Sequence, residues 1–176
     1  MKAIGVVRRI DDLGRIVIPK ELRKTMRIKE GDSLEIFIEG SEKVVLKKYS
    51  PVQNIQDIAE EFTKCLNESN DVDVFITDGE TIISVAGKYK DKLQGKRISR
   101  NMEDRIRNRS VQVIERGSEF EVIDGFKTNK PLIIKSIHLY GDILGSIVII
   151  KDDYISEIDK SLIDFSTLFF NKYLEN

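Results

Sequence analysis

The stretch that decides the fold of the N-terminal part of this chain runs from Gly5 to Lys24 and reads GVVRRIDDLGRIVIPKELRK. Two segments rich in β-branched residues, 4–10 and 15–18, lie on either side of Asp11-Asp12-Leu13-Gly14. Aspartate and glycine favour turns, and Gly14 is free to take a positive φ. The stretch therefore predicts two strands joined by a tight turn, because β-branched side chains favour extended backbone.

The residues that follow extend this pattern into a small module. Pro19 suits the first position of a helix and predicts one over residues 20–26. Apolar residues then alternate over 34–38, and a second run over 44–48 returns after a turn, which is typical of a hairpin. A unit of about fifty residues buries little core on its own. We therefore expect an interlocked homodimer, in which the hairpins of each chain complete the sheet of the other.

The charge of the chain is unevenly distributed. Residues 1–29 hold nine basic and three acidic side chains, a net charge of +6, whereas the whole chain carries −1 and the remaining residues therefore −7. A basic N-terminal part on an acidic body favours a polyanion as the partner of that part alone. The sequence has no apolar run long enough for a signal peptide or a membrane span, so we expect a cytoplasmic protein.

A second domain follows a boundary at Pro51, which disfavours both helix and strand pairing. We assign residues 1–50 to the first domain, 51–55 to a linker and the start of a helix, and 56–176 to the second domain. The pattern predicts helices over 55–66, 101–116 and 156–174, and strands over 71–77, 81–85, 119–123, 131–139 and 145–151. This order indicates an α+β fold, with helices packed on an antiparallel sheet.

Two helices of the second domain carry specific expectations. Cys65, the only cysteine, falls on the apolar stripe of the first helix and is expected in the core. In the last helix the apolar stripe is wider than one face, since Ile163, Phe170 and Tyr173 are added to residues at helical spacing. We expect one side of this helix to meet its own sheet and the other to meet a second protomer, which would give a tetramer.

The first fifty residues closely resemble the AbrB-type swapped-hairpin DNA-binding domain, through residues 5–24, Gly31-Asp32-Ser33-Leu34-Glu35-Ile36 and Val44-Val45-Leu46-Lys47-Lys48-Tyr49. The resemblance implies a β-barrel dimer that binds double-stranded DNA through basic residues of the first hairpin and the short helix. Carried over by position, the DNA-binding residues are Arg8, Arg9, Arg15, Arg23 and Lys24. Lys20 is a weaker candidate.

The whole chain, by its length and its α+β second domain, resembles the AbrB-type regulators of late spore development in endospore-forming bacteria, whose second domain is GAF-like. This resemblance implies a nucleoid-associated activator or repressor of late sporulation genes. No cofactor is expected, although a GAF-like domain could hold an unidentified small molecule. Its aromatic residues are expected in packing rather than in a pocket, and His138, the only histidine, in a structural role, because one histidine cannot form a metal cluster. The aromatic residues concerned are Phe75, Phe120, Phe126 and Tyr140.

Three functions remain in view. Residues 1–50 contain no asparagine or glutamine, the usual readers of adenine, so we expect shape-dependent recognition of DNA by arginine. The same module occurs in antitoxins, but a patterned domain stands here in place of their disordered acidic tail. A small-molecule sensor with incidental DNA affinity is the third alternative. Enzymatic function is not expected, because the sequence has no P-loop and no Gly-x-Ser-x-Gly motif.

Overall fold

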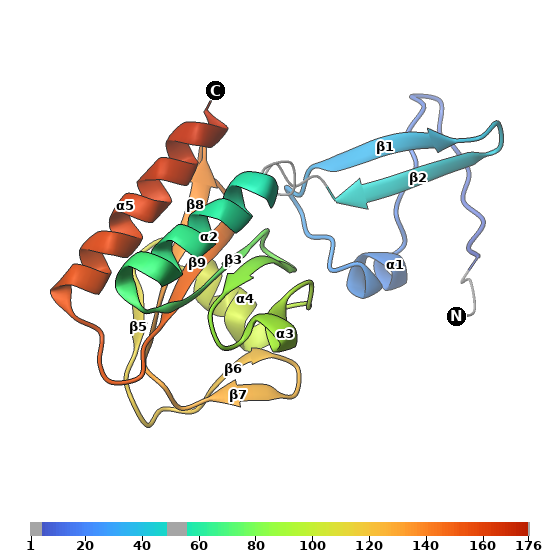
Figure 1. Cartoon of the computed structure of the whole chain (residues 1–176). Coiled ribbons are helices and arrows are strands. Elements are labelled where there is room, and N and C mark those ends of the chain that lie inside the picture. Colours follow the sequence, from blue (N-terminus) through green and yellow to red (C-terminus); the bar gives the residue numbers. More distant parts are fainter. Residues whose placement is uncertain (1–4, 49–55, 176) are drawn as a thin grey trace. The chain divides into compact units, whose positions relative to one another are not determined.

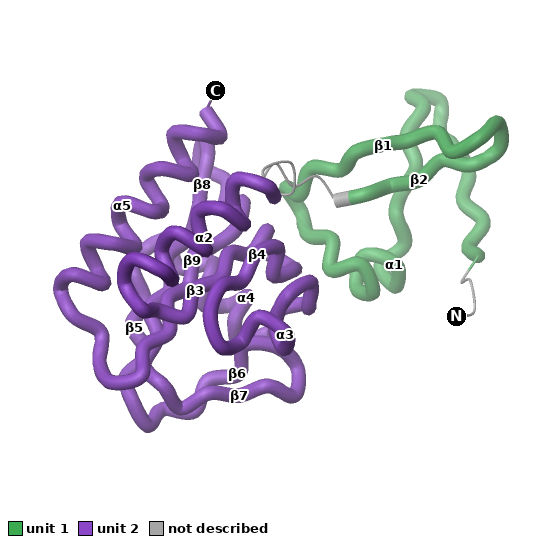
Figure 2. Tube along the Cα trace, viewed as in Figure 1, with its two compact units in different colours: residues 1–49 green, residues 50–176 purple. Residues whose placement is uncertain are grey.

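A computed structural model describes residues 5–48 and 56–175 of the chain. The chain forms two compact units, Met1–Tyr49 and Ser50–Asn176, which are described separately below and are coloured in Figure 2. The predicted linker, residues 51–55, lies outside the described residues. No helix in the described part of the chain is both long and apolar enough to cross a membrane.

Unit 1 contains a short helix followed by a hairpin (Figure 1). The helix is α1 (Lys20–Thr25), and the hairpin consists of β1 (Leu34–Glu39) and β2 (Lys43–Lys48). The two strands pair antiparallel, and Gly40 takes a φ of 67° in the turn between them. These elements confirm the helix and the second hairpin that the sequence predicts.

The first predicted hairpin differs, because residues 5–10 and 15–18 are not strands in the single chain. Only the turn between them is closed, by the Asp11 backbone N–H that donates to the Arg15 carbonyl at 3.1 Å. A strand exists only through a neighbouring strand that satisfies its backbone groups. The apolar side chains of these segments are correspondingly exposed: Val6, Val7, Ile10, Ile16 and Val17.

Unit 2 is built on a five-stranded antiparallel sheet with the strand order β4-β3-β9-β8-β5. The strands are β3 (Asp73–Thr77), β4 (Ile82–Ala86), β5 (Gln112–Ile114), β8 (Leu132–Leu139) and β9 (Asp142–Ile150). Alternate residues of a strand point to opposite faces, and both faces are buried here. Four of its strands, β3, β4, β8 and β9, confirm strands that the sequence predicts, whereas β5 falls within residues 101–116, which were predicted as helix.

Two long helices cover one face of this sheet: α2 (Gln56–Asn70) and α5 (Glu157–Leu174), as Figure 1 shows. They pack on a core that includes Ile76, Ile133 and Ile149. Cys65 of α2 is exposed, so the expectation that it lies in the core is wrong. The helix instead buries Ala59, Thr63 and Leu66, and the Thr63 hydroxyl lies 2.7 Å from that of Ser84.

The opposite face of the sheet is covered by shorter elements: α3 (Lys90–Leu93), α4 (Arg100–Ile106), β6 (Phe120–Ile123) and β7 (Phe126–Thr128). The predicted helix over 101–116 is therefore too long. It ends where the Asn108 side chain accepts hydrogen bonds from the N–H and hydroxyl of Ser110, a local pairing that competes with helix. The residues beyond it form β5 and a turn.

Candidate nucleic-acid interface

The turn of the first hairpin is fixed by the Asp11 carboxylate. It accepts hydrogen bonds from the backbone N–H groups of Leu13 at 3.1 Å and Arg15 at 2.7 Å. Gly14 takes a φ of 75°, which a residue with a Cβ rarely adopts. The two arms of the hairpin lead away from this turn, one toward the N-terminus and the other to α1 (Figure 1).

The same carboxylate holds Arg15. The Nε of Arg15 donates to Asp11 Oδ2 at 2.8 Å, while the Arg15 side chain remains 69% exposed. The hydrogen bond from the Arg15 backbone, followed by that from its guanidinium, keeps the pKa of the Asp11 carboxyl below its ordinary value of 3.8. A guanidinium presents five N–H donors in a rigid fork, so this pairing through Nε orients Arg15 while its side chain stays exposed to solvent.

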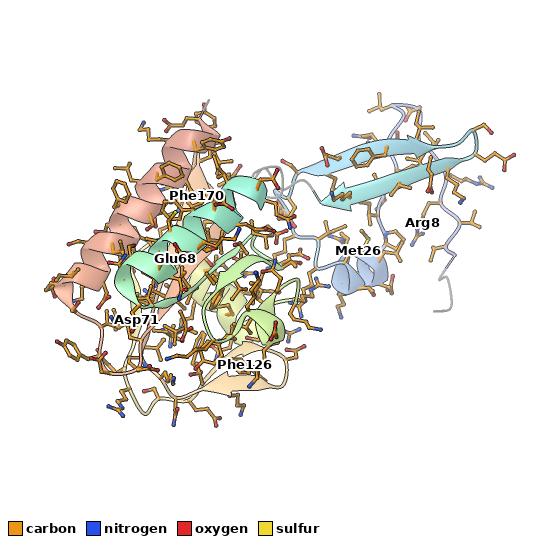
Figure 3. The ribbon with its side chains drawn as sticks, in the orientation of Figure 1. Arg8, Met26, Glu68, Asp71, Phe126 and Phe170 are labelled. Carbon is orange, nitrogen blue, oxygen red and sulfur yellow. The ribbon has the colours of Figure 1, made fainter. Side chains whose placement is uncertain are left out.

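Arg8 and Arg9 lie on the arm that precedes the turn, and both are exposed. Figure 3 labels Arg8 on this arm. Because both side chains are exposed, both guanidinium groups are accessible to an anionic ligand.

Helix α1 presents Arg23 and Lys24, both exposed, in its last turn. Pro19 is buried where the helix begins, and Leu22 is half-buried. The helix ends in a Schellman motif: the Ile28 N–H donates to the Arg23 carbonyl at 2.8 Å and the Arg27 N–H to the Lys24 carbonyl at 3.2 Å. Arg27 takes the left-handed φ of 52° that this motif needs. The chain thus fixes the backbone of the two residues that carry the cations.

All five predicted DNA-binding side chains are therefore exposed in the single protomer, on the two arms of the hairpin and on α1. Lys20, the weaker candidate, is exposed as well. Of the five cations, Arg15 is held in place by a described side-chain contact, the one with Asp11. No described contact brings the five side chains together into one cluster. Sequence reasoning assigned Asp11 only to a turn; its position four residues before an arginine, at the start of the turn, is the signal for its second role.

The second unit provides the remaining candidate residues. Phe75 and Phe120 are buried in the core and Phe126 is half-buried against it, as expected of packing residues, whereas Tyr140 is exposed. The backbone N–H of His138 donates to Asn171 of α5 at 3.1 Å, and its ring Nδ1 lies 3.4 Å from the Ser136 carbonyl. Among the described residues no group of three potential ligands could hold a metal ion.

Both units match families of known proteins. Residues 54–175 match the family model for the C-terminal domain of stage V sporulation protein T, a transcription factor. Residues 7–54 match the model for antidote-toxin recognition MazE, a bacterial antitoxin. Stage V sporulation protein T of Bacillus subtilis is 37% identical over 177 residues, which cover 99% of each chain. The transition state regulatory protein AbrB of Bacillus subtilis is 40% identical over 87 residues, 49% of this chain and 81% of AbrB.

The fold of the second unit has a counterpart among solved structures. The GAF domain of nlh2 from A. aeolicus is 19% identical, covers 71% of this chain and 83% of its own, and gives a TM-score of 0.51. At this identity the likeness concerns the fold alone. An AbrB-type hairpin module followed by a GAF-like domain defines a two-domain transcription regulator. The chain belongs to the stage V sporulation protein T family, as the family model and the full-length Bacillus relative show.

Proposed function

We propose that two copies of unit 1 interlock into a dimer that binds double-stranded DNA through Arg8, Arg9, Arg15, Arg23 and Lys24. The dimer regulates late sporulation genes from within the nucleoid. The observation that carries this proposal is that, among the described residues, every buried hydrophobic residue of the core belongs to unit 2. Residues 5–48 of unit 1 thus contain no buried hydrophobic core, and a second copy of the same unit would provide one.

The apolar surface of unit 1 supports this arrangement. On the hairpin of β1 and β2, Ile36, Ile38 and Val44 are each at least 69% exposed. On the N-terminal arm, Val7 is 94% exposed. Burial of such a side chain stabilises the folded state by about 1.5–3 kcal/mol. A monomer that leaves these side chains exposed therefore lacks most of the stability that a domain of this size can reach.

The chemistry of the exposed cations fits a phosphate backbone. Lysine and arginine that neutralise phosphates release condensed counterions, which provides affinity without reading sequence. Arginine can in addition read guanine or enter a narrow minor groove. Since residues 1–50 contain no asparagine or glutamine, recognition depends on DNA shape more than on adenine contacts. A selection experiment that returns one invariant adenine-dependent motif would contradict this.

We also propose that two such dimers join into a tetramer through the helices of unit 2. Helix α5 has a second apolar stripe beside its buried face, with Ile158 at 74%, Phe165 at 62% and Leu168 at 56% exposure. Phe169 on the edge of this stripe stacks on Phe62 of α2, with ring centroids 5.0 Å apart, so the two helices form a continuous apolar surface. Helices from a second copy would cover it, as in a four-helix bundle.

The experiment that tests the DNA-binding proposal is a gel-shift titration of the full chain at two salt concentrations. We expect Arg15→Ala and Arg23→Ala to stay folded and dimeric, to lose most DNA affinity and to show a shallower dependence on salt. The control is Lys43→Ala at the start of β2, which should bind as the wild type does. Equal binding by all three variants and the wild type would refute the assigned surface.

The antitoxin alternative rests on the match of residues 7–54 to the MazE model. It carries less weight, because that match covers only the module that both classes share, whereas the second unit matches the sporulation family. A small toxin that co-purifies with the chain, encoded by a neighbouring gene, would favour the alternative.

A further inference from the structure

Unit 2 is acidic as a whole but contains one strongly basic segment. Residues 50–176 hold 17 basic and 22 acidic side chains. Within them, residues 88–109 hold nine basic and only three acidic side chains, a net charge of +6. This equals the net charge of residues 1–29, from which a polyanion partner was inferred. We refer to residues 88–109 as the basic segment.

The basic segment covers one face of the five-stranded sheet of unit 2. It comprises α3, α4 and their connections, which pack over one face of the sheet through Leu93, Met102 and Ile106. These three side chains are at most 3% exposed, whereas all nine basic side chains of the segment are exposed. The fold therefore anchors the segment from beneath and presents its cations to solvent.

The cations of the basic segment are also largely unneutralised. Outside the segment, seven of the eight basic residues of unit 2 form ion pairs with carboxylates. Inside it, only two do so, Lys88 with Asp152 at 2.6 Å and Arg97 with Glu80 at 2.9 Å. The other seven make no ion pair with any residue that the structure describes. Seven such cations within residues 88–109 repel one another, and a bound polyanion would relieve this repulsion.

We propose that the basic segment of unit 2 binds the phosphate backbone of duplex DNA beyond the site that unit 1 holds. This inference rests on the proposed function. Exposed ammonium and guanidinium groups spread over two helices and a loop suit an extended polyanion, whose charge repeats along its length. A single small anion would instead need a compact set of buried donors. Because both units belong to one chain, DNA held by unit 1 is at high effective concentration for unit 2.

The test compares a segment variant, Lys90→Gln with Lys96→Gln and Arg100→Gln, with a control variant, Lys64→Gln with Lys127→Gln and Lys160→Gln. Both triple variants change the net charge of unit 2 by −3, but the control lysines are ion-paired in the structure. The full chain is titrated with a short duplex that spans only the binding site and with the same site in a duplex extended on both sides. Circular dichroism and sedimentation confirm that all variants fold and assemble alike.

We expect the segment variant to bind the extended duplex about tenfold or more weakly than the control, with a log–log salt slope shallower by roughly 2–3. On the short duplex the two variants should bind equally. If the segment variant matches the control on the extended duplex, the inference is overturned. Failure of the proposed function is distinguishable, because Arg15→Ala would then bind the short duplex as the wild type does.

Discussion

A single carboxylate, that of Asp11, both closes the first hairpin turn and holds the guanidinium of Arg15. The sequence assigns Arg15 to the DNA-binding residues by its match to the family pattern, and that role stays a prediction. The contact between Asp11 and Arg15 was not predicted, since a turn-forming aspartate looks the same in sequence whether its second oxygen faces water or an arginine. The sequence shows which side chains are charged. The direction in which each of them points depends on the folded backbone.

The two parts of the Asp11 interaction can be separated by substitution. We expect Asp11→Ala to weaken DNA binding about three- to tenfold, the effect of losing a hydrogen bond worth roughly 1 kcal/mol. Asp11→Asn keeps an oxygen for the backbone N–H groups but loses the charge that orients Arg15, so it should lie between Asp11→Ala and the wild type. Gel-shift titration at fixed salt measures both. Tighter binding by both variants would mean that the negative charge merely opposes DNA.

Asp152 provides a residue-scale prediction on pH. It bonds Lys130 and Lys88, which lowers its pKa from 3.8 to about 2. Because the folded-state pKa is depressed, the stabilisation is fully present above about pH 4 and is lost as the pH falls through about 2. We expect Asp152→Asn to be less stable than the wild type at neutral pH, and the two to converge only below about pH 2. Thermal unfolding across this range measures it, and a pH-independent difference would contradict the assignment.

The helices show how far periodicity carries a prediction at the scale of elements. For α5 the width of the apolar stripe predicted two apolar faces, and the structure buries one of them on the sheet and exposes the other. For α2 the same reasoning put Cys65 in the core. It failed for Cys65 only. Ala59 and Leu66 of the same stripe are buried, and Ile58 and Phe62 pack against the core. The buried face also contains Thr63, a polar residue paired with Ser84, which leaves Cys65 at its exposed edge.

Turns were the other source of error among the elements. The hairpin of β6 and β7 turns at Asp124-Gly125, where Gly125 has a φ of 82°, yet only its first strand was predicted. The strands of residues 5–18 were predicted but are absent from the single chain. Sequence pattern reports which residues favour extended backbone, but pairing requires a partner whose location the pattern does not contain.

The start of α5 allows a prediction at the scale of a single helix. Ser156 and Asp159 form a capping box, in which the Ser156 hydroxyl accepts from the Asp159 N–H and the Asp159 carboxylate accepts from the Ser156 N–H. We expect Ser156→Ala to lower the free energy of unfolding by about 1 kcal/mol. Denaturant titration measures the loss. Ser161→Ala, at an exposed position of the same helix, is the control and should change the stability little.

The molecule as a whole combines one unit that folds around its own core with one whose described residues include no buried hydrophobic core. This division was visible in the sequence as a short module followed by a longer patterned domain. The boundaries 1–50 and 56–176 remain predictions, as does the assembly. What the sequence could not indicate is the second concentration of unpaired cations in unit 2, because pairing depends on where the carboxylates of other elements lie.

The tetramer is tested at this scale. We expect Phe165→Glu on the exposed stripe of α5 to halve the mass in sedimentation, since a buried charge opposes the interface between dimers while unit 1 still holds each dimer together. Lys160→Glu, which lies off the stripe on the same helix, is the control and should leave the mass unchanged. A wild type that sediments as a dimer, or a Phe165→Glu variant that remains a tetramer, would contradict the arrangement.

The uneven location of the core, confined to unit 2 among the described residues, has a thermodynamic consequence. If unit 1 is stable only as a dimer, its unfolding is coupled to dissociation, and its melting temperature falls when the protein is diluted. Heating should then produce two transitions, of which the one at lower temperature moves upward as more protein is added and the other stays in place. In a cell the same coupling makes occupancy of a promoter rise more steeply than the amount of protein synthesised.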